Sequence, residues 1–325
     1  MIEVKFFKSE NILEWNNFLI NSKGQTFMFN RSYMDYHTDR FIDRSVLIYE
    51  NGELVAMMPA SLNIDSISIT SHSGLTFGSF IVKENLRTTK TIEYFYHCIN
   101  FLHTNNISYL YFKQIPLFYS NITSDEVDYA NFILEAEMYR VDIAYVIKYK
   151  KQIPYQERRI RSIKKAIKNK IEVKQEKTFE KFWNEILIPN LKERFGVNPV
   201  HSLEEITELA YKNEKSIVQY NAYLGSQIIA GTTLFITPTV VHAQYISASD
   251  EGRKNGGLDF LFDFIIKHYS GHKKFFDFGI VNENSGKSIN QGLLDWKEGF
   301  GARAYVHRFY KIDTIKSKNL LKILQ

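Results

Sequence analysis

The sequence predicts a mixed α/β protein in which one pattern of strands and helices occurs twice. The chain has 325 residues, about twice the usual length of one domain. Glu3-Val4-Lys5 recurs as Glu172-Val173-Lys174, 169 residues further along, and an aromatic-rich amphipathic segment follows each copy. We therefore expect two domains, one over residues 1–150 and the other over 151–325.

A hairpin and a third strand come next in each copy. Residues 46–49 and 54–57 flank Asn51-Gly52, which favours a two-residue type I′ turn. In the second copy, residues 217–223 and 228–230 flank Gly225. The third strands are expected at 66–71 and 240–247. The 34 residues from Ser216 to Ser249 carry no charge, but they include polar residues and Pro238, and we interpret them as three buried strands.

Each copy then continues with a helix, a short buried strand and an aromatic-rich strand. Apolar residues at helical spacing predict helices over 92–102 and 258–269. Buried strands are expected at 109–112 and 275–278, and the final strands at 139–149 and 304–311. Helices that alternate with strands after a hairpin predict a mixed, partly antiparallel sheet flanked by helices in each domain.

The cysteine count and the start of the chain favour a cytoplasmic protein without a metal. Cys98 is the only cysteine, so no internal disulfide can form, and the first residues lack the apolar run of a signal peptide. The helical pattern around Cys98 predicts a small buried residue rather than a nucleophile. Cysteine clusters and zinc-type histidine spacing are absent from the sequence, so we expect no metal site.

The positive charge is concentrated in one segment. The net charge is +5, and residues 148–174 contain 11 Lys or Arg against Glu157 and Glu172. A helical pattern over 158–168 places Ile160, Ile163 and Ile167 on one stripe. A tRNA backbone, a nucleotide-sugar diphosphate or an anionic lipid carrier could bind its cations, or the segment is a solvated helix between domains. The candidate tRNA contacts are Arg158, Arg159, Arg161, Lys164, Lys165 and Lys168.

The segment 244–258 joins a strand to a helix through a basic, glycine-containing turn. Such a turn directs backbone N–H groups and the positive end of a helix toward one point, where a phosphate can bind. The candidates for this role are Arg253, Lys254, Asn255, Gly256 and Gly257. A plain strand-to-helix turn is the alternative, and the glycine spacing matches neither a Walker loop nor a dinucleotide-binding loop.

These residues resemble the pyrophosphate loop of the GNAT superfamily of acyl-CoA-dependent acyltransferases. Further segments look like the bacterial GNAT branch related to Fem-type peptidoglycan bridge aminoacyltransferases, whose members carry two tandem GNAT-like domains. They are Pro199-Val200-His201-Ser202, His242-Ala243-Gln244-Tyr245-Ile246, Phe276-Asp277-Phe278-Gly279, Ser288-Ile289-Asn290-Gln291-Gly292-Leu293, Lys297-Glu298-Gly299-Phe300-Gly301 and, in the first half, 72–78. The resemblance implies two tandem GNAT-like domains, with the donor site in the second.

Acyl transfer to an amine needs hydrogen-bond donors for the oxyanion and groups that move protons. His242 and Asp277 are the candidates for proton transfer, with Tyr245 as a third catalytic candidate; a core histidine and a sheet-bracing aspartate are the alternatives. The remaining expected site residues are Ser247 and Ala248 for the oxyanion, Asn290 and Lys297 for the acyl carrier, and His72, Arg194 and His201 for the acceptor. Asn290 could instead cap a helix, and Lys297 could be a solvated side chain.

The resemblance implies an N-acyltransferase that uses acetyl-CoA or another acyl-CoA. Its expected acceptor is a primary amine of a cell-envelope precursor, either an amino sugar or a peptidoglycan intermediate. No heptad segment resembles the coiled-coil insertion that Fem-type enzymes often carry, so aminoacyl-tRNA is the alternative donor. A catalytically inert binding protein of the same fold is a further alternative.

Overall fold

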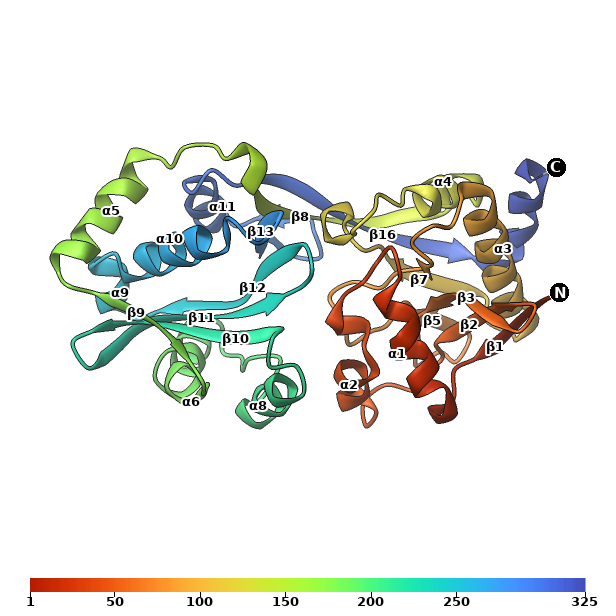
Figure 1. Ribbon diagram of the computed structural model, residues 1–325, viewed down its shortest axis with the longest axis horizontal. Coiled ribbons are helices and arrows are strands. Elements are labelled where there is room, and N and C mark those ends of the chain that lie inside the picture. The colour runs from red at the N-terminus through yellow and green to blue at the C-terminus, as the bar shows by residue number, and fades with distance from the viewer. Residues whose placement is uncertain (325) are drawn as a thin grey trace. The chain divides into compact units, whose positions relative to one another are not determined.

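The computed structural model describes residues 1–324, except the His37 side chain, and its contacts divide the chain into two compact units (Figure 1). Unit 1 comprises Met1–Asp142 and the end of the chain from Val306, and unit 2 comprises Ile143–Tyr305. The expected ranges 1–150 and 151–325 follow the order of the two copies along the sequence. In space, the last segment of the second copy, from Val306 onward, packs with the first copy in unit 1.

Unit 1 contains a four-stranded sheet in the order β1-β2-β3-β6 and a second set of strands. The first sheet consists of β1 (Ile2–Phe6), β2 (Val46–Glu50), β3 (Glu53–Met58) and β6 (Ile81–Val82). The second set is β4 (Ser61–Leu62), β5 (Ser68–Thr70), β7 (Tyr109–Lys113) and the end of β16 (Arg303–Asp313). β5 pairs in parallel with β7, and β16 pairs antiparallel to it, so the arrangement is mixed as predicted.

Short and long helices connect these strands. They are η1 (Ser9–Asn11), α1 (Ile12–Ile20), η2 (Phe27–Phe29), α2 (Arg31–Met34), η3 (Asp35–His37), α3 (Thr88–Thr104), η4 (Leu117–Tyr119), α4 (Glu126–Ile133) and, at the end of the chain, η7 (Thr314–Ile323). The predicted hairpin is present, and Asn51 and Gly52 both have positive φ angles, 52° and 83°, as a type I′ turn requires.

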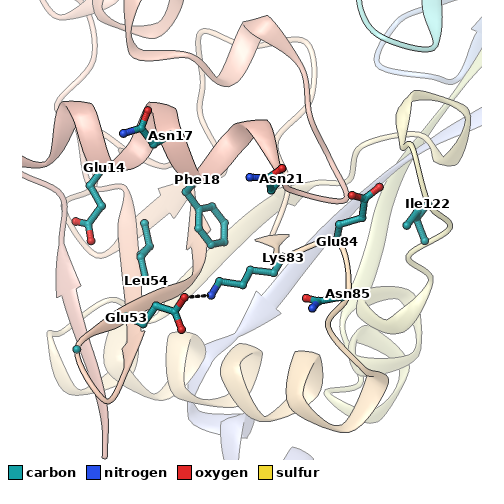
Figure 2. A pocket seen from close by; sticks show the side chains of 11 residues that line it. Glu14, Asn17, Phe18, Asn21, Glu53, Leu54, Lys83, Glu84, Asn85 and Ile122 are labelled. Carbon is teal, nitrogen blue, oxygen red and sulfur yellow. Dashed lines mark hydrogen bonds and ion pairs between the residues drawn. The ribbon is translucent and has the colours of Figure 1, made fainter.

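A groove of about 800 Å³ lies in unit 1 beside α1 and the β2–β3 turn (Figure 2). Its lining mixes polar and apolar surface and comprises Glu14, Asn17, Phe18, Asn21, Gly52, Glu53, Leu54, Lys83, Glu84, Asn85 and Ile122. Lys83 forms an ion pair with Glu53 at its edge. None of the site residues expected from the sequence is among the residues that line this groove.

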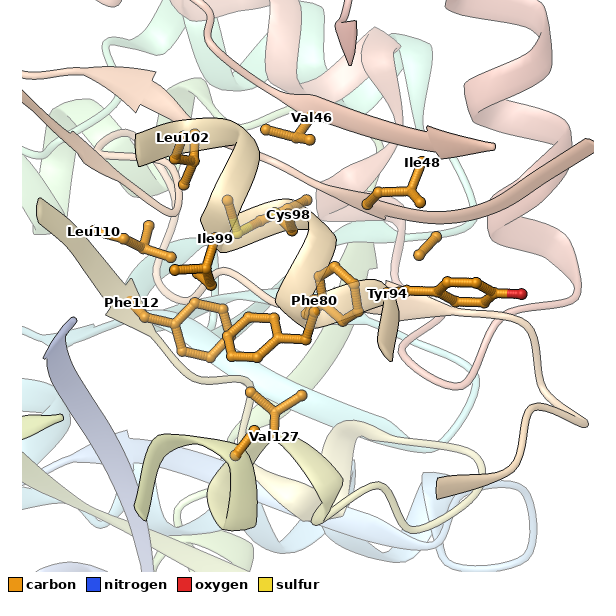
Figure 3. Packing of buried hydrophobic residues seen from close by; sticks show 14 of the residues in the cluster. Val46, Ile48, Phe80, Tyr94, Cys98, Ile99, Leu102, Leu110, Phe112 and Val127 are labelled. Atoms are coloured by element: carbon orange, nitrogen blue, oxygen red, sulfur yellow. The ribbon is translucent and has the colours of Figure 1, made fainter. Parts of the chain in front are cut away.

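The core of unit 1 is built around the apolar stripe of α3 (Figure 3). Phe95, Cys98 and Leu102 are fully buried on this helix, and Val46 of β2 and Leu110 of β7 belong to the same cluster. The predicted burial of Cys98 is therefore confirmed. Burial in apolar surroundings raises the pKa of its thiol and keeps the thiol protonated.

In unit 2, the strands from β13 to β9 form a sheet in the order β13-β12-β11-β10-β9, and β8 pairs antiparallel to β13. The strands are β8 (Glu137–Lys148), β9 (Glu172–Glu176), β10 (Ile217–Leu224), β11 (Gln227–Ile236), β12 (Val240–Ala248) and β13 (Phe275–Ile280). A separate pair joins β14 (Asn282–Glu283) and β15 (Ser288–Ile289). The uncharged 34-residue stretch thus forms β10, β11 and β12, which confirms the prediction.

Helices cover both faces of this sheet. α5 (Glu157–Lys168), α9 (Asp250–Lys254), α10 (Gly257–Tyr269) and α11 (Gln291–Glu298) contribute to one side, and α6 (Glu180–Phe182) and α8 (Leu203–Lys212) lie on the other (Figure 1). The remaining helices are η5 (Tyr149–Lys151), the π-helical turn η6 (Trp183–Leu187) and α7 (Ile188–Phe195). Within residues 1–324, no helix combines the length and the apolar composition that crossing a bilayer needs.

Candidate functional site

Two neighbouring strands of unit 2 separate at the place where the sequence predicts catalytic residues. β12 and β13 are paired in parallel only as far as His242 and Asp277. β13 is paired with β8 on its other edge from Phe275 onward and keeps only this pairing beyond Asp277, where Ile280 faces Ala144, while β12 stays paired with β11 as far as Ala248. The second half of β12 therefore has one edge that β13 does not cover, with His242 and Asp277 at the start of the opening.

His242 and Asp277 form a hydrogen-bonded pair. Nδ1 of His242 lies 2.8 Å from Oδ2 of Asp277, and the Asp277 side chain is fully buried. Oδ1 of Asp277 accepts a second hydrogen bond, 2.7 Å long, from the Gly279 amide. A carboxylate at Nδ1 places the proton on that nitrogen and leaves Nε2 as the basic atom. Nε2 makes no hydrogen bond within residues 1–324, and the His242 side chain is 13% exposed, so Nε2 can accept a proton from a ligand.

Lys297 is buried beside this pair. Its side chain projects from α11, and Nζ donates hydrogen bonds to the carbonyl oxygens of Gly279 and Ile280, at 2.9 and 2.8 Å. Burial lowers the pKa of Lys297 to about 7, and the negative charge of Asp277 opposes this shift. The alternative of a solvated side chain is therefore wrong, because Lys297 is only 2% exposed.

Gly279 gives the irregular end of β13 the shape that Lys297 and Asp277 bind. Its φ angle is +77°, in the left-handed region that favours glycine. A Cβ atom at this position would lie 3.4 Å from Cε1 of His242. The end of β13 thus binds the buried carboxylate and the buried amine, and it lies next to the histidine ring.

One backbone N–H on the open edge of β12 can bind an oxyanion. The amide of Ser249 donates to Ile229 of β11, so alternation along the strand turns the Ser247 amide toward β11 as well and the Ala248 amide toward the open edge. Asn190 of α7 holds this end of the strand, since its Nδ2 donates to Ser247 Oγ at 2.8 Å and to the Ala248 carbonyl at 2.9 Å. No pattern in the sequence predicts this role of Asn190, because only the packing of α7 against β12 brings its side chain there.

The turn between α9 and α10 packs tightly against the rest of unit 2. A Cβ on Gly256 would lie 2.3 Å from the Ser162 carbonyl oxygen of α5, and a Cβ on Gly257 would lie 2.7 Å from Cδ1 of Ile229. The side chain of Asn255 accepts a hydrogen bond from Asn169 at 2.9 Å. Close packing therefore accounts for both glycines, which is the role that a plain turn also gives them.

The same turn keeps exposed cations and free backbone donors at the start of α10. Arg253 donates to the Ala248 carbonyl and, at 2.5 Å, to Asp250, while the Lys254 side chain is exposed. The first amides of a helix have no acceptor within the helix. The end of β12, the two cations and the start of α10 are therefore suited to bind a phosphate or pyrophosphate group.

Tyr245 and His201 form a second cluster. The Tyr245 hydroxyl lies 2.5 Å from Nδ1 of His201 and accepts a hydrogen bond from the His201 amide at 3.1 Å. The Trp183 ring packs edge-on to Tyr245, with 5.1 Å between the ring centres. Burial raises the pKa of Tyr245 to about 12, so its hydroxyl stays protonated. The expected roles of Tyr245 in catalysis and of His201 in acceptor binding stay predictions.

The remaining expected site residues lie at different places. Arg194 is exposed on α7, and its charge contributes to the lowered pKa of Asp250, whose main cause is the hydrogen bond from Arg253. Asn290 caps α11, since its Oδ1 accepts from the Leu293 amide at 3.0 Å. The alternative that Asn290 is a helix N-cap is thus confirmed.

His72 belongs to unit 1, where a partly buried lysine that the sequence did not predict lies close to the same loop. His72 is 3% exposed and has a φ angle of +66°. Nζ of Lys113 donates to the carbonyl oxygens of Ser73, at 3.5 Å, and Leu75. Burial and, to a smaller extent, the charge of Arg140 lower the pKa of Lys113 to about 8. Its place at the end of a buried strand was the available signal.

The predicted basic helix is α5, but one of its cations turns inward. Nη1 of Arg159 binds both carboxylate oxygens of Asp259, at 2.6 and 2.7 Å, and Trp296 donates to the same carboxylate at 2.8 Å. Arg159 therefore fixes α5 to α10, and its prediction as a tRNA contact is wrong. Lys165 donates to the Lys254 carbonyl at 2.8 Å, whereas Arg158, Arg161, Lys164 and Lys168 are exposed.

The described part of the chain, residues 1–324, contains no group of three or more His, Cys, Asp or Glu side chains that could hold a metal ion.

The two units are tandem GNAT-like domains, each with a mixed, partly antiparallel sheet and flanking helices, as the sequence predicts. The structure is similar to that of FemX, with a TM-score of 0.66, 10% identity, and coverage of 99% of this chain and 100% of that chain. It is also similar to a tandem GNAT protein from the clavulanic acid biosynthesis pathway (TM-score 0.52, 9% identity, coverage 97% and 99%) and to L-PGS from Bacillus licheniformis (TM-score 0.56, 14% identity, coverage 98% and 96%). The predicted likeness to Fem-type and tandem GNAT proteins is thereby confirmed for the fold.

Sequence comparisons find no matching family model and no similar curated protein.

Proposed function

We propose that this protein is an N-acyltransferase that moves an acyl group from acyl-CoA to a primary amine of a cell-envelope precursor. The observation that carries the proposal is the His242–Asp277 pair at the point where β12 and β13 separate. It provides a base whose basic nitrogen is available to a ligand, next to a strand edge with an unpaired backbone donor. The tandem GNAT fold supports acyl transfer as the class of reaction.

In this mechanism the unit 2 residues move one proton and bind one developing charge. The acceptor's ammonium group first loses one proton to water, and His242 Nε2 takes the second proton, which the nitrogen loses as it attacks; Asp277 keeps the other ring proton on Nδ1 and stabilises the charged ring. The free amine attacks the thioester carbon, so a C–N bond forms while the Ala248 N–H binds the oxyanion. The C–S bond then breaks, and the thiolate leaves with the proton that His242 returns.

The donor's pyrophosphate would bind at the start of α10. Arg253 and Lys254 supply positive charge there, and the amides of the first turn supply hydrogen bonds. Acetyl-CoA is the simplest donor of this kind. Asn290 is used as a helix cap, so within this proposal it shapes α11 rather than holding the acyl carrier.

Aminoacyl-tRNA is the second candidate donor. The exposed cations of α5 favour it, together with the similarity of the fold to FemX over nearly the whole length of both chains. The chemistry at His242 would be the same, but an ester bond to the tRNA would break instead of a thioester.

A donor-and-acceptor screen tests the proposal. The full chain is incubated with acyl-CoA or aminoacyl-tRNA and with amino-sugar nucleotides or peptidoglycan precursors, and products are detected by mass spectrometry. The proposal expects an acyl product with acyl-CoA and none with His242→Ala, while His272→Ala, an exposed histidine after α10, stays active. A product from aminoacyl-tRNA alone would establish the second candidate donor. No product from either donor would contradict the proposal and favour a catalytically inert binding protein of the same fold.

A further inference from the structure

The outward face of α5 carries cations that unit 2 does not use. Arg161, Lys164 and Lys168 are exposed and make no hydrogen bond or ion pair within residues 1–324. Glu157 is the single acidic residue of the helix. These cations therefore contribute nothing to the packing of the unit, and their charge is directed to solvent.

Isoleucine side chains lie beside these cations. Ile167 is 57% exposed and Ile160 is half-buried. Because residues three or four apart are neighbours on a helix, Ile160, Lys164 and Ile167 share one flank of α5. We call the outward residues Ile160, Arg161, Lys164, Ile167 and Lys168 the α5 face. Exposed isoleucine is unfavourable in water, so this combination indicates a partner that is both anionic and apolar.

The opposite side of α5 is firmly attached to unit 2. Ile163 and Ala166 are buried, and Arg159 binds Asp259 of α10. The face is therefore presented by a helix that is already formed, and binding has no cost of ordering it.

We propose that the α5 face docks the protein on an anionic membrane surface. The cations would contact lipid phosphates, and the Ile167 side chain would enter the boundary between headgroups and acyl chains. A nucleic-acid backbone satisfies the cations as well, but it offers no apolar environment to Ile167. A lipid surface satisfies both kinds of residue, so the observations favour it. Docking is separate from acyl transfer and requires neither donor nor acceptor.

Vesicle flotation with the full chain tests this docking. The vesicles contain phosphatidylglycerol mixed with phosphatidylcholine, and vesicles of phosphatidylcholine alone serve as the uncharged reference. The chain should float with the anionic vesicles at low salt, and raising the salt concentration should weaken the binding. Each cation near an anionic surface strengthens binding roughly fivefold, so the triple variant R161Q/K164Q/K168Q should bind about 100-fold more weakly.

Two further variants test whether vesicle binding depends on the α5 face itself or only on the net charge of the chain. K177Q/K215Q/K318Q removes three exposed lysines elsewhere and should bind nearly as the parent does. Ile167→Ser leaves the charge unchanged and should weaken binding about tenfold through lost apolar burial. Circular dichroism confirms that each variant is folded.

Three results would overturn the proposal. The first is no binding to anionic vesicles at low salt, and the second is equal binding by the two triple variants. The third is an Ile167→Ser variant that binds vesicles like the parent while tRNA displaces the chain from them, which would make the α5 face a nucleic-acid site.

Discussion

Both units hold a lysine amine on two backbone carbonyl oxygens, but only unit 2 buries the lysine fully and adds a histidine and a carboxylate. Lys113 in unit 1 binds the carbonyls of Ser73 and Leu75, and Lys297 in unit 2 binds those of Gly279 and Ile280. In both cases burial lowers the pKa of the amine.

The two lysines differ in the side chains that lie next to them. In unit 2 the lysine is next to Asp277, which holds His242 in one tautomer. The comparison indicates that a lysine amine holds a short backbone segment in each unit, while the pair that can move a proton belongs to unit 2 alone. Each prediction below tests one part of this contrast, from the largest expected effect to the smallest.

Replacing His242 should have the largest effect. His242→Ala removes the proposed base, and general-base catalysis typically contributes about 100- to 10,000-fold, so acyl transfer should fall by that factor with little loss of thermal stability. Initial rates with the acceptor found in the screen measure it, and His272→Ala is the control. A His242→Ala variant with the parent's rate would show that unit 2 has no special role as a source of the base.

The pH dependence of stability should reveal the buried amine of Lys297. Its folded pKa of about 7 is below the value of 10.5 for a free lysine, so the unfolded chain binds more protons between these values. The free energy of unfolding should therefore rise with pH above 7 relative to Lys297→Met, by about 4 kcal/mol at pH 10. Urea unfolding of both proteins at several pH values measures this difference.

Lys113 should give a smaller change of the same sign. Its folded pKa is about 8, so the rise relative to Lys113→Met should begin one pH unit higher and reach about 3 kcal/mol at pH 10. A curve for Lys113 that matches the curve for Lys297 would remove this difference between the two units, and a flat curve for either would show that its amine stays charged in the fold.

A side chain at Gly279 should disturb the end of β13, which Lys297 and Asp277 bind. Gly279→Ala forces alanine into a left-handed conformation, which costs about 1–2 kcal/mol, and brings its Cβ within 3.4 Å of the His242 ring. We expect a lower thermal midpoint and slower acyl transfer. Gly271→Ala, where a Cβ would meet open space, should change neither.

Tyr245→Phe should have the smallest effect if the tyrosine only supports His201. Loss of one hydrogen bond of this kind typically lowers the free energy of unfolding by about 0.5–1.5 kcal/mol. The ratio kcat/KM shows whether Tyr245 is structural or catalytic, because replacing a structural tyrosine leaves kcat/KM of the folded protein nearly unchanged. A loss of 100-fold or more would assign Tyr245 to the catalytic machinery.

The repeated pattern of strands and helices could be predicted because its signals are local. The Asn51-Gly52 turn and the apolar stripe of α3 depend on neighbouring residues, and both are present (Figure 3). The uncharged stretch 216–249 likewise forms strands, because polar residues and turn signals interrupt it.

Site chemistry could be predicted in part. Asp277 lies opposite His242, as neighbouring buried strands at that place in the pattern suggested. Asn190 and Lys113 were missed, because their polar atoms reach the site or the loop only through packing of distant segments. Arg159 was placed on the wrong face, since the sequence does not show that Asp259 attracts it inward.

The sequence by itself determined the duplicated α/β pattern, the basic segment and the residue types available for acyl transfer, because spacing and composition are properties of the chain. Tertiary structure decided which of these residues meet. It paired His242 with Asp277, buried Lys297, brought Lys113 to the carbonyls of Ser73 and Leu75, and placed the end of the chain with unit 1. These outcomes depend on contacts between residues far apart in the sequence, where burial and charge pairing select one arrangement.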